Sequence, residues 1–306
     1  MEQAFLFPGQ GAQYSGMGKD WYDAFPVAKE TFEEANQVLG FSLTDAIWAE
    51  GDGVNRTDIA QPGILATSAA IVAVLRDKGF NTAQASFTAG LSLGEYTALW
   101  FAGSLKFADA IRLVRLRGEA MQAAAELSES SMLALTGGNE EQAVKLAAIG
   151  SEHGICAVAN LNAPGQVILS GEIAALDAAA AAAKDVGVRR TRRLVVAGGF
   201  HSECMAPAQA RLETALAEVE ISAPQIPFAT NVTAGLVTDP SEIRSFLAKQ
   251  VCSPVRWEQS MRGALERGVR SFIEPGPGKV LTGLMGRIDS EAEVRSIAVP
   301  GDLEAS

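Results

Sequence analysis

The chain has 306 residues, of which 48% are hydrophobic and 20% charged, and its formal net charge is −11 at pH 7. These values are typical of a globular protein with a large core, and they exclude a disordered or fibrous chain. The acidic balance argues against a general binder of nucleic acids or anionic membranes. Three widely spaced cysteines and only two histidines argue against a disulfide framework and a metal centre, so we expect no metal site and a reducing, cytoplasmic setting.

The first 127 residues alternate short apolar strands with helical patterns. We expect strands at residues 4–7 and 86–89 and helices near 20–38, 61–78, 95–102 and 107–125. This alternation predicts a mostly parallel sheet covered by helices. We expect no targeting or membrane-spanning segment, because the apolar run around 69–75 is too short to cross a bilayer.

A different pattern covers residues 128–197. It predicts strands at 132–136, 156–161, 166–170 and 188–196 and helices at 140–149 and 174–185. The order βαββαβ is the ferredoxin-like arrangement. The larger pattern then resumes, with a helix over 203–219, strands at 226–230, 269–273 and 294–298, and a last helix over 279–287. The sequence thus predicts an α/β fold in which a ferredoxin-like unit, 128–197, is inserted into a larger unit of residues 1–127 and 198–306.

The segment Gly90-Leu91-Ser92-Leu93-Gly94 is a G-x-S-x-G motif between a predicted strand and a predicted helix. Such a turn exposes the serine at a helix N-terminus, where free N–H groups favour a developing oxyanion. The alternative is a tight turn without chemistry. A nucleophilic serine needs a base, and the chain offers two histidines. His201 follows the predicted strand ending at residue 196, whereas His153 lies in a polar stretch that indicates a solvated helix end.

Arg117 falls opposite the polar face of its predicted helix, which carries Arg112, Arg115 and Glu119. An inward-facing arginine needs an anion, because an unpaired buried charge is very costly. The anion is either an internal carboxylate or the carboxylate of a substrate. The basic run 189–193 is a second feature with two interpretations, a solvated strand edge or a docking patch for an acidic partner.

Several segments together resemble the malonyl-CoA:acyl carrier protein transacylase family. They span nearly the whole chain, and they are Phe7–Gln13, Gly90–Tyr96, Arg115–Gln122, Asn160–Ile168, Gly199–Ser202, Gln250, Ser253–Trp257 and Glu274–Leu281. The family's fold, an α/β-hydrolase-like domain with an inserted ferredoxin-like subdomain, agrees with the pattern described above.

The resemblance implies a role for each matching residue. Ser92 would be the nucleophile and His201 the general base, with Arg117 bound to the malonyl carboxylate. The backbone N–H groups of Gln10 and Leu93 would form the oxyanion hole. The backbone carbonyl of Gln250 would orient the histidine. The last three matching residues would contact CoA or the carrier, and they are Asn160, Gln166 and Arg190.

One position departs from the family pattern. Leu91 stands where the family usually has a histidine before the nucleophile, which puts the fine acyl specificity in doubt but not the base. Phe200 before His201 resembles the malonyl-type pattern. The implied activity is malonyl transfer from malonyl-CoA to acyl carrier protein in fatty-acid synthesis, through a malonyl-serine, by a monomer without a cofactor. A trans-acting polyketide acyltransferase, a serine thioesterase or esterase and a non-catalytic carrier-binding module are the alternatives.

Overall fold

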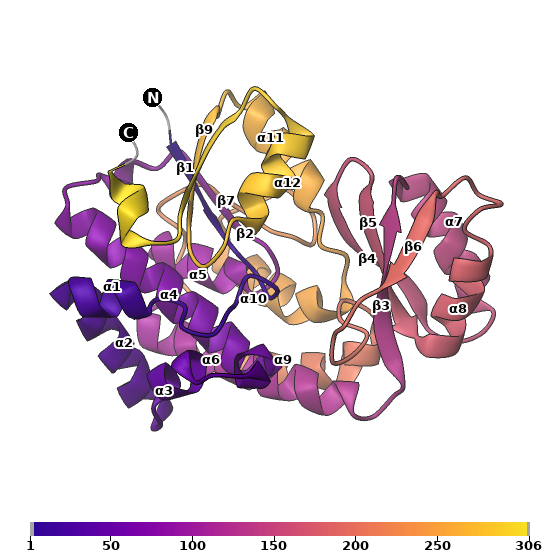
Figure 1. The fold of residues 1–306 in the computed structure, drawn as a ribbon, viewed down its shortest axis with the longest axis horizontal. Coiled ribbons are helices and arrows are strands. Elements are labelled where there is room, and N and C mark those ends of the chain that lie inside the picture. The colour runs from indigo at the N-terminus through magenta and orange to yellow at the C-terminus, as the bar shows by residue number, and fades with distance from the viewer. Residues whose placement is uncertain (1–2, 305–306) are drawn as a thin grey trace.

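A computed structural model describes residues 3–304 of the chain, and a six-stranded sheet forms the centre of the larger of its two units (Figure 1). Five strands run parallel in the order β10-β9-β1-β2-β7, and β8 pairs antiparallel with β7 at one edge. The strands are β1 (Gln3–Phe7), β2 (Phe87–Gly90), β7 (Phe228–Ala229), β8 (Leu236–Val237), β9 (Ser271–Pro275) and β10 (Glu293–Ile297). The predicted, mostly parallel sheet is confirmed.

Helices cover both faces of this sheet, as the apolar strands require, since a strand buried on both faces needs a partner on each. One apolar core lies mainly under α4, α6 and α9, and another lies between the sheet and α11 and α12. The helices of the larger unit are α1 (Lys19–Ala24), α2 (Pro26–Leu39), α3 (Leu43–Trp48), α4 (Thr57–Asp77), α5 (Gly94–Phe101), α6 (Phe107–Ala125), α9 (Ala206–Ala217), α10 (Pro240–Lys249), α11 (Trp257–Glu266) and α12 (Val280–Ile288).

The smaller unit follows α6 in the chain and lies to one side of the larger unit (Figure 1). Its antiparallel strands lie in the order β4-β5-β3-β6, which is the ferredoxin-like order, and α7 and α8 pack on the sheet around a separate apolar core. Its elements are β3 (Ser130–Thr136), α7 (Glu140–Ser151), β4 (Cys156–Ala163), β5 (Gln166–Glu172), α8 (Ile173–Ala181) and β6 (Arg190–Arg193). The predicted insertion is confirmed, while its boundaries at residues 127/128 and 197/198 stay a prediction.

The strand predicted over residues 188–196 is much shorter than expected. β6 ends at Arg193, and Val195 is fully exposed. Leu194 donates one more backbone hydrogen bond to Met132 before the chain leaves the sheet edge and returns to the larger unit. Apolar, β-branched residues suggested a strand here, but beyond Leu194 the chain no longer pairs with β3.

Helix α4 meets the length and hydropathy of a membrane span, which the short apolar run 69–75 did not suggest. The helix has 21 residues, and an 18-residue stretch of it has a mean hydropathy of 1.6, with 89% of that stretch buried inside the fold. Burial to this extent is typical of a core helix. By its contacts α4 packs against α2 and α6.

Candidate active site

Ser92 lies at a sharp turn between β2 and α5. Its φ of 55° is in the left-handed region, which non-glycine residues rarely adopt. The turn depends on the flanking glycines: a Cβ on Gly90 would lie 1.8 Å from the carbonyl carbon of Gly94, and a Cβ on Gly94 would lie 2.2 Å from the oxygen of Phe7. Only glycine allows this approach of three backbone segments. The strand, turn and helix predicted around the motif are therefore confirmed.

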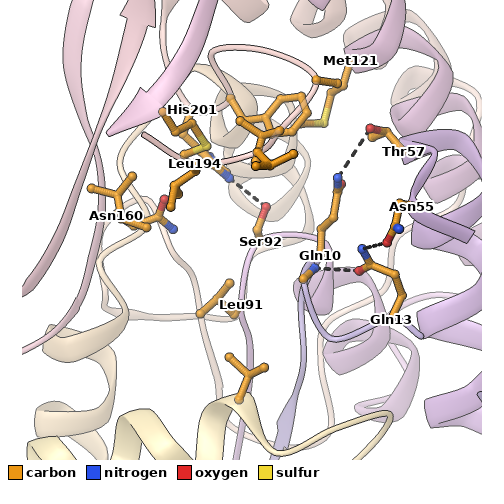
Figure 2. A pocket seen from close by; sticks show the side chains of 18 of the residues that line it. Gln10, Gln13, Asn55, Thr57, Leu91, Ser92, Met121, Asn160, Leu194 and His201 are labelled. Atoms are coloured by element: carbon orange, nitrogen blue, oxygen red, sulfur yellow. Dashed lines mark hydrogen bonds between the residues drawn. The ribbon is translucent and has the colours of Figure 1, made fainter. Parts of the chain in front are cut away.

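His201 faces Ser92 from a different part of the chain (Figure 2). Its Nε2 lies 2.8 Å from Ser92 Oγ, and both side chains are buried. His153 is exposed after the end of α7, as predicted. His201 follows a strand of the smaller unit, β6, as predicted, but it does not follow directly, because β6 ends at Arg193 and not at residue 196. The histidine instead lies in a turn with a φ of 60° before α9.

Backbone carbonyls, rather than a carboxylate, orient the imidazole. His201 Nδ1 lies 2.9 Å from the backbone oxygen of Gln250 and 3.2 Å from that of Ser253. A carbonyl can only accept, so Nδ1 carries the proton and Nε2 is left to accept from Ser92 Oγ–H. Burial and the nearby Arg117 charge lower the pKa of His201 to about 4, so the imidazole is neutral at pH 7.

Arg117 is 1% exposed and reaches Ser92 from α6. Its Nη2 donates to Ser92 Oγ and to Gln250 Oε1, both at 2.9 Å, and its Nη1 donates to Gln61 Oε1 at 2.8 Å. The inward orientation predicted from the helix is confirmed. Within residues 3–304 no carboxylate forms an ion pair with this guanidinium, and its buried Nε–H has no partner. This finding favours a substrate carboxylate over an internal carboxylate as the anion that binds Arg117.

The two backbone N–H groups predicted to form the oxyanion hole belong to Gln10 and Leu93. In the described part of the chain, neither the Gln10 nor the Leu93 N–H donates to another protein group. Leu93 immediately precedes α5, where helix N–H groups are free. The Gln10 side chain runs alongside Ser92 and donates to Thr57 Oγ1 at 3.4 Å (Figure 2). Both positions are compatible with the predicted oxyanion hole.

A cavity of about 860 Å³ opens above Ser92 between the two units. Asn160 and Gln166 line it from the smaller unit, and Leu91 lines it beside the serine. Arg190 lies farther out, exposed in a groove of about 370 Å³ that Gln166 also lines. Of the three residues predicted to contact CoA or a carrier, two therefore lie in the cavity with Ser92 and the third lies in the neighbouring groove.

The comparisons with known proteins agree with this geometry. The acyl transferase domain family matches residues 4–304. A malonyl CoA-acyl carrier protein transacylase of Bacillus subtilis is 40% identical over 304 residues, which cover 98% of this chain and 95% of the relative. The chain belongs to the malonyl-CoA:acyl carrier protein transacylase family. Its departure from the family pattern at Leu91 leaves the contact between Ser92 and His201 intact.

Solved structures of transacylases share the whole fold. An acyl-carrier-protein-S-malonyltransferase from Bartonella henselae superposes with a TM-score of 0.96 at 39% identity, covering 100% of this chain and 98% of that one. A malonyl-transacylase in complex with a type II PKS acyl-carrier protein gives a TM-score of 0.94 at 38% identity, with 99% and 98% coverage.

Three further residues of this transacylase site were not predicted. Gln61 contacts Arg117 from the predicted helix 61–78, where nothing distinguished it. Asn231 accepts from the Ser92 N–H at 2.7 Å and donates to the Gly90 carbonyl at 2.8 Å. Glu95 is fully buried directly after the motif. Only Glu95 carried a signal, because a charged residue is unexpected at the buried start of a core helix.

Proposed function

We propose that the protein transfers the malonyl group of malonyl-CoA to the phosphopantetheine thiol of an acyl carrier protein, in fatty-acid biosynthesis in the cytoplasm. The observation that carries this proposal is Arg117, a buried guanidinium that lies beside the Ser92–His201 pair and forms no ion pair with a carboxylate of the described residues. The malonyl group supplies the missing carboxylate. The names of relatives that are 35–40% identical over nearly the full chain support the same reaction.

In the first half-reaction, Ser92 Oγ attacks the thioester carbonyl while His201 Nε2 takes the hydroxyl proton. The oxyanion that forms would be stabilised by the N–H groups of Gln10 and Leu93. The C–S bond then breaks, the proton passes from His201 to the CoA sulfur, and malonyl remains on Ser92 as an ester. The backbone oxygen of Gln250 would hold the imidazole throughout.

The second half-reaction reverses these steps with the carrier thiol as the nucleophile. His201 takes the thiol proton, the sulfur attacks the ester carbonyl, and the proton returns to Ser92 Oγ as the ester bond breaks. Asn160 and Gln166 would contact the pantetheine arm in the cavity, and Arg190 would meet phosphate or an acidic carrier outside it. The serine and histidine suffice for this chemistry, so the proposed reaction uses no cofactor.

A polyketide pathway is the alternative that one observation favours. One of the similar structures is a malonyl-transacylase bound to a type II PKS acyl-carrier protein, at 38% identity. The reaction would be the same and only the carrier would differ. A thioesterase is less compatible with this site, because hydrolysis has no use for an arginine at the serine and such enzymes normally orient the base with a carboxylate.

Mass spectrometry of the intact protein tests the proposal directly. Mixed with malonyl-CoA, acetyl-CoA and methylmalonyl-CoA, the protein should retain a malonyl group on Ser92, and added carrier protein should remove it. Ser92→Ala should abolish loading, because no other nucleophile occupies the turn. Malonyl retained by Ser92→Ala, or steady release of free malonate that carrier does not compete with, would contradict the assignment.

A further inference from the structure

Glu95 is a buried carboxylate beside the nucleophile that the proposed reaction does not use. Its side chain is fully buried in the first turn of α5, and in the described residues it forms no ion pair. Burial raises the pKa of Glu95 to about 7, although hydrogen bonds and the Arg117 charge oppose this rise. A charge without a counter-ion is costly in a protein interior, so the position requires an explanation.

The carboxylate of Glu95 joins two loops at the base of the site. Its Oε1 accepts from the backbone N–H of Asn231 at 2.5 Å, and its Oε2 accepts from the side-chain Nε2 of Gln250. Both oxygens face donors, which is the environment of an ionised carboxylate rather than of a protonated one.

These contacts determine which way the Gln250 amide points. Because Nε2 donates to Glu95 and to the backbone oxygen of Ser92, Oε1 faces the other way and accepts from Arg117 Nη2 at 2.9 Å. The same Nη2 donates to Ser92 Oγ. We infer that Glu95 is a positioning residue: it fixes the Gln250 amide and thereby holds the Arg117 guanidinium at the serine, so that it sets the selectivity for a carboxylated acyl group. This inference rests on the proposed function.

Replacement of Glu95 by glutamine separates this role from space filling. Glutamine has the same shape but only one acceptor oxygen, so it cannot satisfy both donors. The backbone N–H of Asn231 cannot turn away, and the new NH₂ group would therefore face Gln250. The Gln250 amide would have to turn its oxygen toward residue 95 and its NH₂ toward Arg117, which places donor against donor.

The experiment compares kcat/KM for malonyl-CoA and acetyl-CoA at pH 8, above the Glu95 pKa. Glu95→Gln should lower the malonyl-to-acetyl ratio roughly 10- to 100-fold, the usual range for a lost hydrogen bond to a charged group. Glu95→Asp keeps both acceptor oxygens and should retain more of the ratio. Glu274→Gln is the matched control, since Glu274 is a fully buried glutamate that accepts from backbone N–H groups at the start of α12. The malonyl-to-acetyl ratio of this variant should equal that of the wild type.

Two results would overturn the inference. One is an unchanged ratio in folded Glu95→Gln, and the other is a larger loss in Glu95→Asp than in Glu95→Gln, which would indicate that only side-chain volume matters. A crystal structure of Glu95→Gln gives an outcome independent of activity: the contact between Arg117 and Ser92 Oγ should be lost, and an unchanged contact contradicts the inference. If the wild type does not prefer malonyl-CoA to acetyl-CoA, the proposed function fails. The crystal structure of Glu95→Gln would still show whether Glu95 positions Arg117.

Discussion

At the scale of single residues, the site concentrates backbone strain at the two residues that we propose to react. Ser92 and His201 have φ values of 55° and 60°, and the only other non-glycine residue with a positive φ in the described chain is Ala234. Such conformations cost about 1–3 kcal/mol each and persist only where the surroundings impose them. Here the surroundings are the close glycine contacts and the carbonyls that hold the imidazole. The serine and the imidazole are therefore held in contact before a substrate arrives, which reduces the reorganisation needed for attack.

We expect Arg117 to determine which acyl group the protein accepts. A planar guanidinium holds a carboxylate through two parallel hydrogen bonds, which a lysine ammonium cannot reproduce. Removing one partner of such a pair costs about 2–5 kcal/mol, or roughly 30- to several-thousand-fold. Arg117→Ala should lower kcat/KM for malonyl-CoA by such a factor and spare acetyl-CoA, and Arg117→Lys should recover part of the loss.

Arg112→Ala is the matched control for Arg117, because Arg112 is exposed on the same helix and pairs only with Asp109. It should leave both substrates unaffected. An equal loss of malonyl and acetyl transfer in folded Arg117→Ala, checked by circular dichroism, would mean that Arg117 only stabilises the fold.

His201 should titrate far below an ordinary histidine. Its pKa of about 4 lies below the unfolded value of 6.5, so between these two values the unfolded chain binds a proton that the folded protein does not. The free energy of unfolding therefore falls as the pH is lowered from 6.5 toward 4, because protonation of this histidine favours the unfolded chain. Above pH 6.5 this residue causes no such loss. Nuclear magnetic resonance of labelled histidines gives the pKa directly, and the signal absent from His201→Ala identifies the residue. A pKa near 6.5 would refute the prediction.

At the scale of elements, the basic run provides a test of the outer groove. Arg189, Arg190 and Arg192 are exposed, whereas Arg193 pairs with Asp177 and is half-buried. Arg190 and Arg192 line the groove next to the cavity. Replacing both arginines by alanine should raise KM for malonyl-CoA or for the carrier at low salt, because surface charges mainly steer association. The rate of Ser92 acylation at saturating malonyl-CoA should stay unchanged.

The same assay on Arg262→Ala with Arg267→Ala controls for total charge. Arg262 is exposed on α11, Arg267 is exposed directly after the end of this helix, and neither lines the groove. The control should keep both KM values. Unchanged KM for both substrates in the Arg190 and Arg192 variant would leave these arginines as a solvated strand edge that discourages sheet pairing.

Elements whose pattern is local were predictable from the sequence. Helix α6 has the predicted bounds, and the inward face that carries Arg117 followed from its 3.6-residue period. Elements that depend on distant partners were not. The strand expected at 226–230 is only two residues long and forms a hairpin with β8, which was not predicted. The split of 20–38 into two helices at Phe25 is different, because Pro26, which begins the second helix, is a local signal that the prediction missed.

The site was predictable only as far as its residues belong to recognisable motifs. Ser92 and His201 lie 109 positions apart, and nothing local indicates that the fold brings them within 2.8 Å. The family resemblance supplied that pairing. The side chains of Gln61 and Asn231 complete the site through tertiary contacts, and no spacing in the sequence encodes such contacts.

At the scale of the whole molecule, the two units enclose the reaction. The smaller unit is attached through β4: Leu161 donates to Val255, and Val255 donates to Ala159, at 2.9 and 2.8 Å. The segment that carries Val255 also contains Gln250 and Ser253, whose carbonyls hold His201. One stretch of chain therefore both contacts the smaller unit and holds the His201 imidazole, so the two units meet beside the serine.

The cavity at Ser92 predicts the kinetic mechanism. Ser92 lies in a cavity of about 860 Å³, within the range of sites that hold one small ligand. CoA and the carrier present the same kind of pantetheine arm to one serine, so both arms cannot occupy the cavity together. The first thiol must leave before the second enters, and malonyl must wait on Ser92. We expect labelled CoA to exchange into malonyl-CoA without any carrier, and initial-rate plots for the two substrates to form parallel lines. Ser92→Ala should abolish the exchange. Intersecting lines without exchange would mean that both substrates bind at once, and the serine would then not carry the malonyl group.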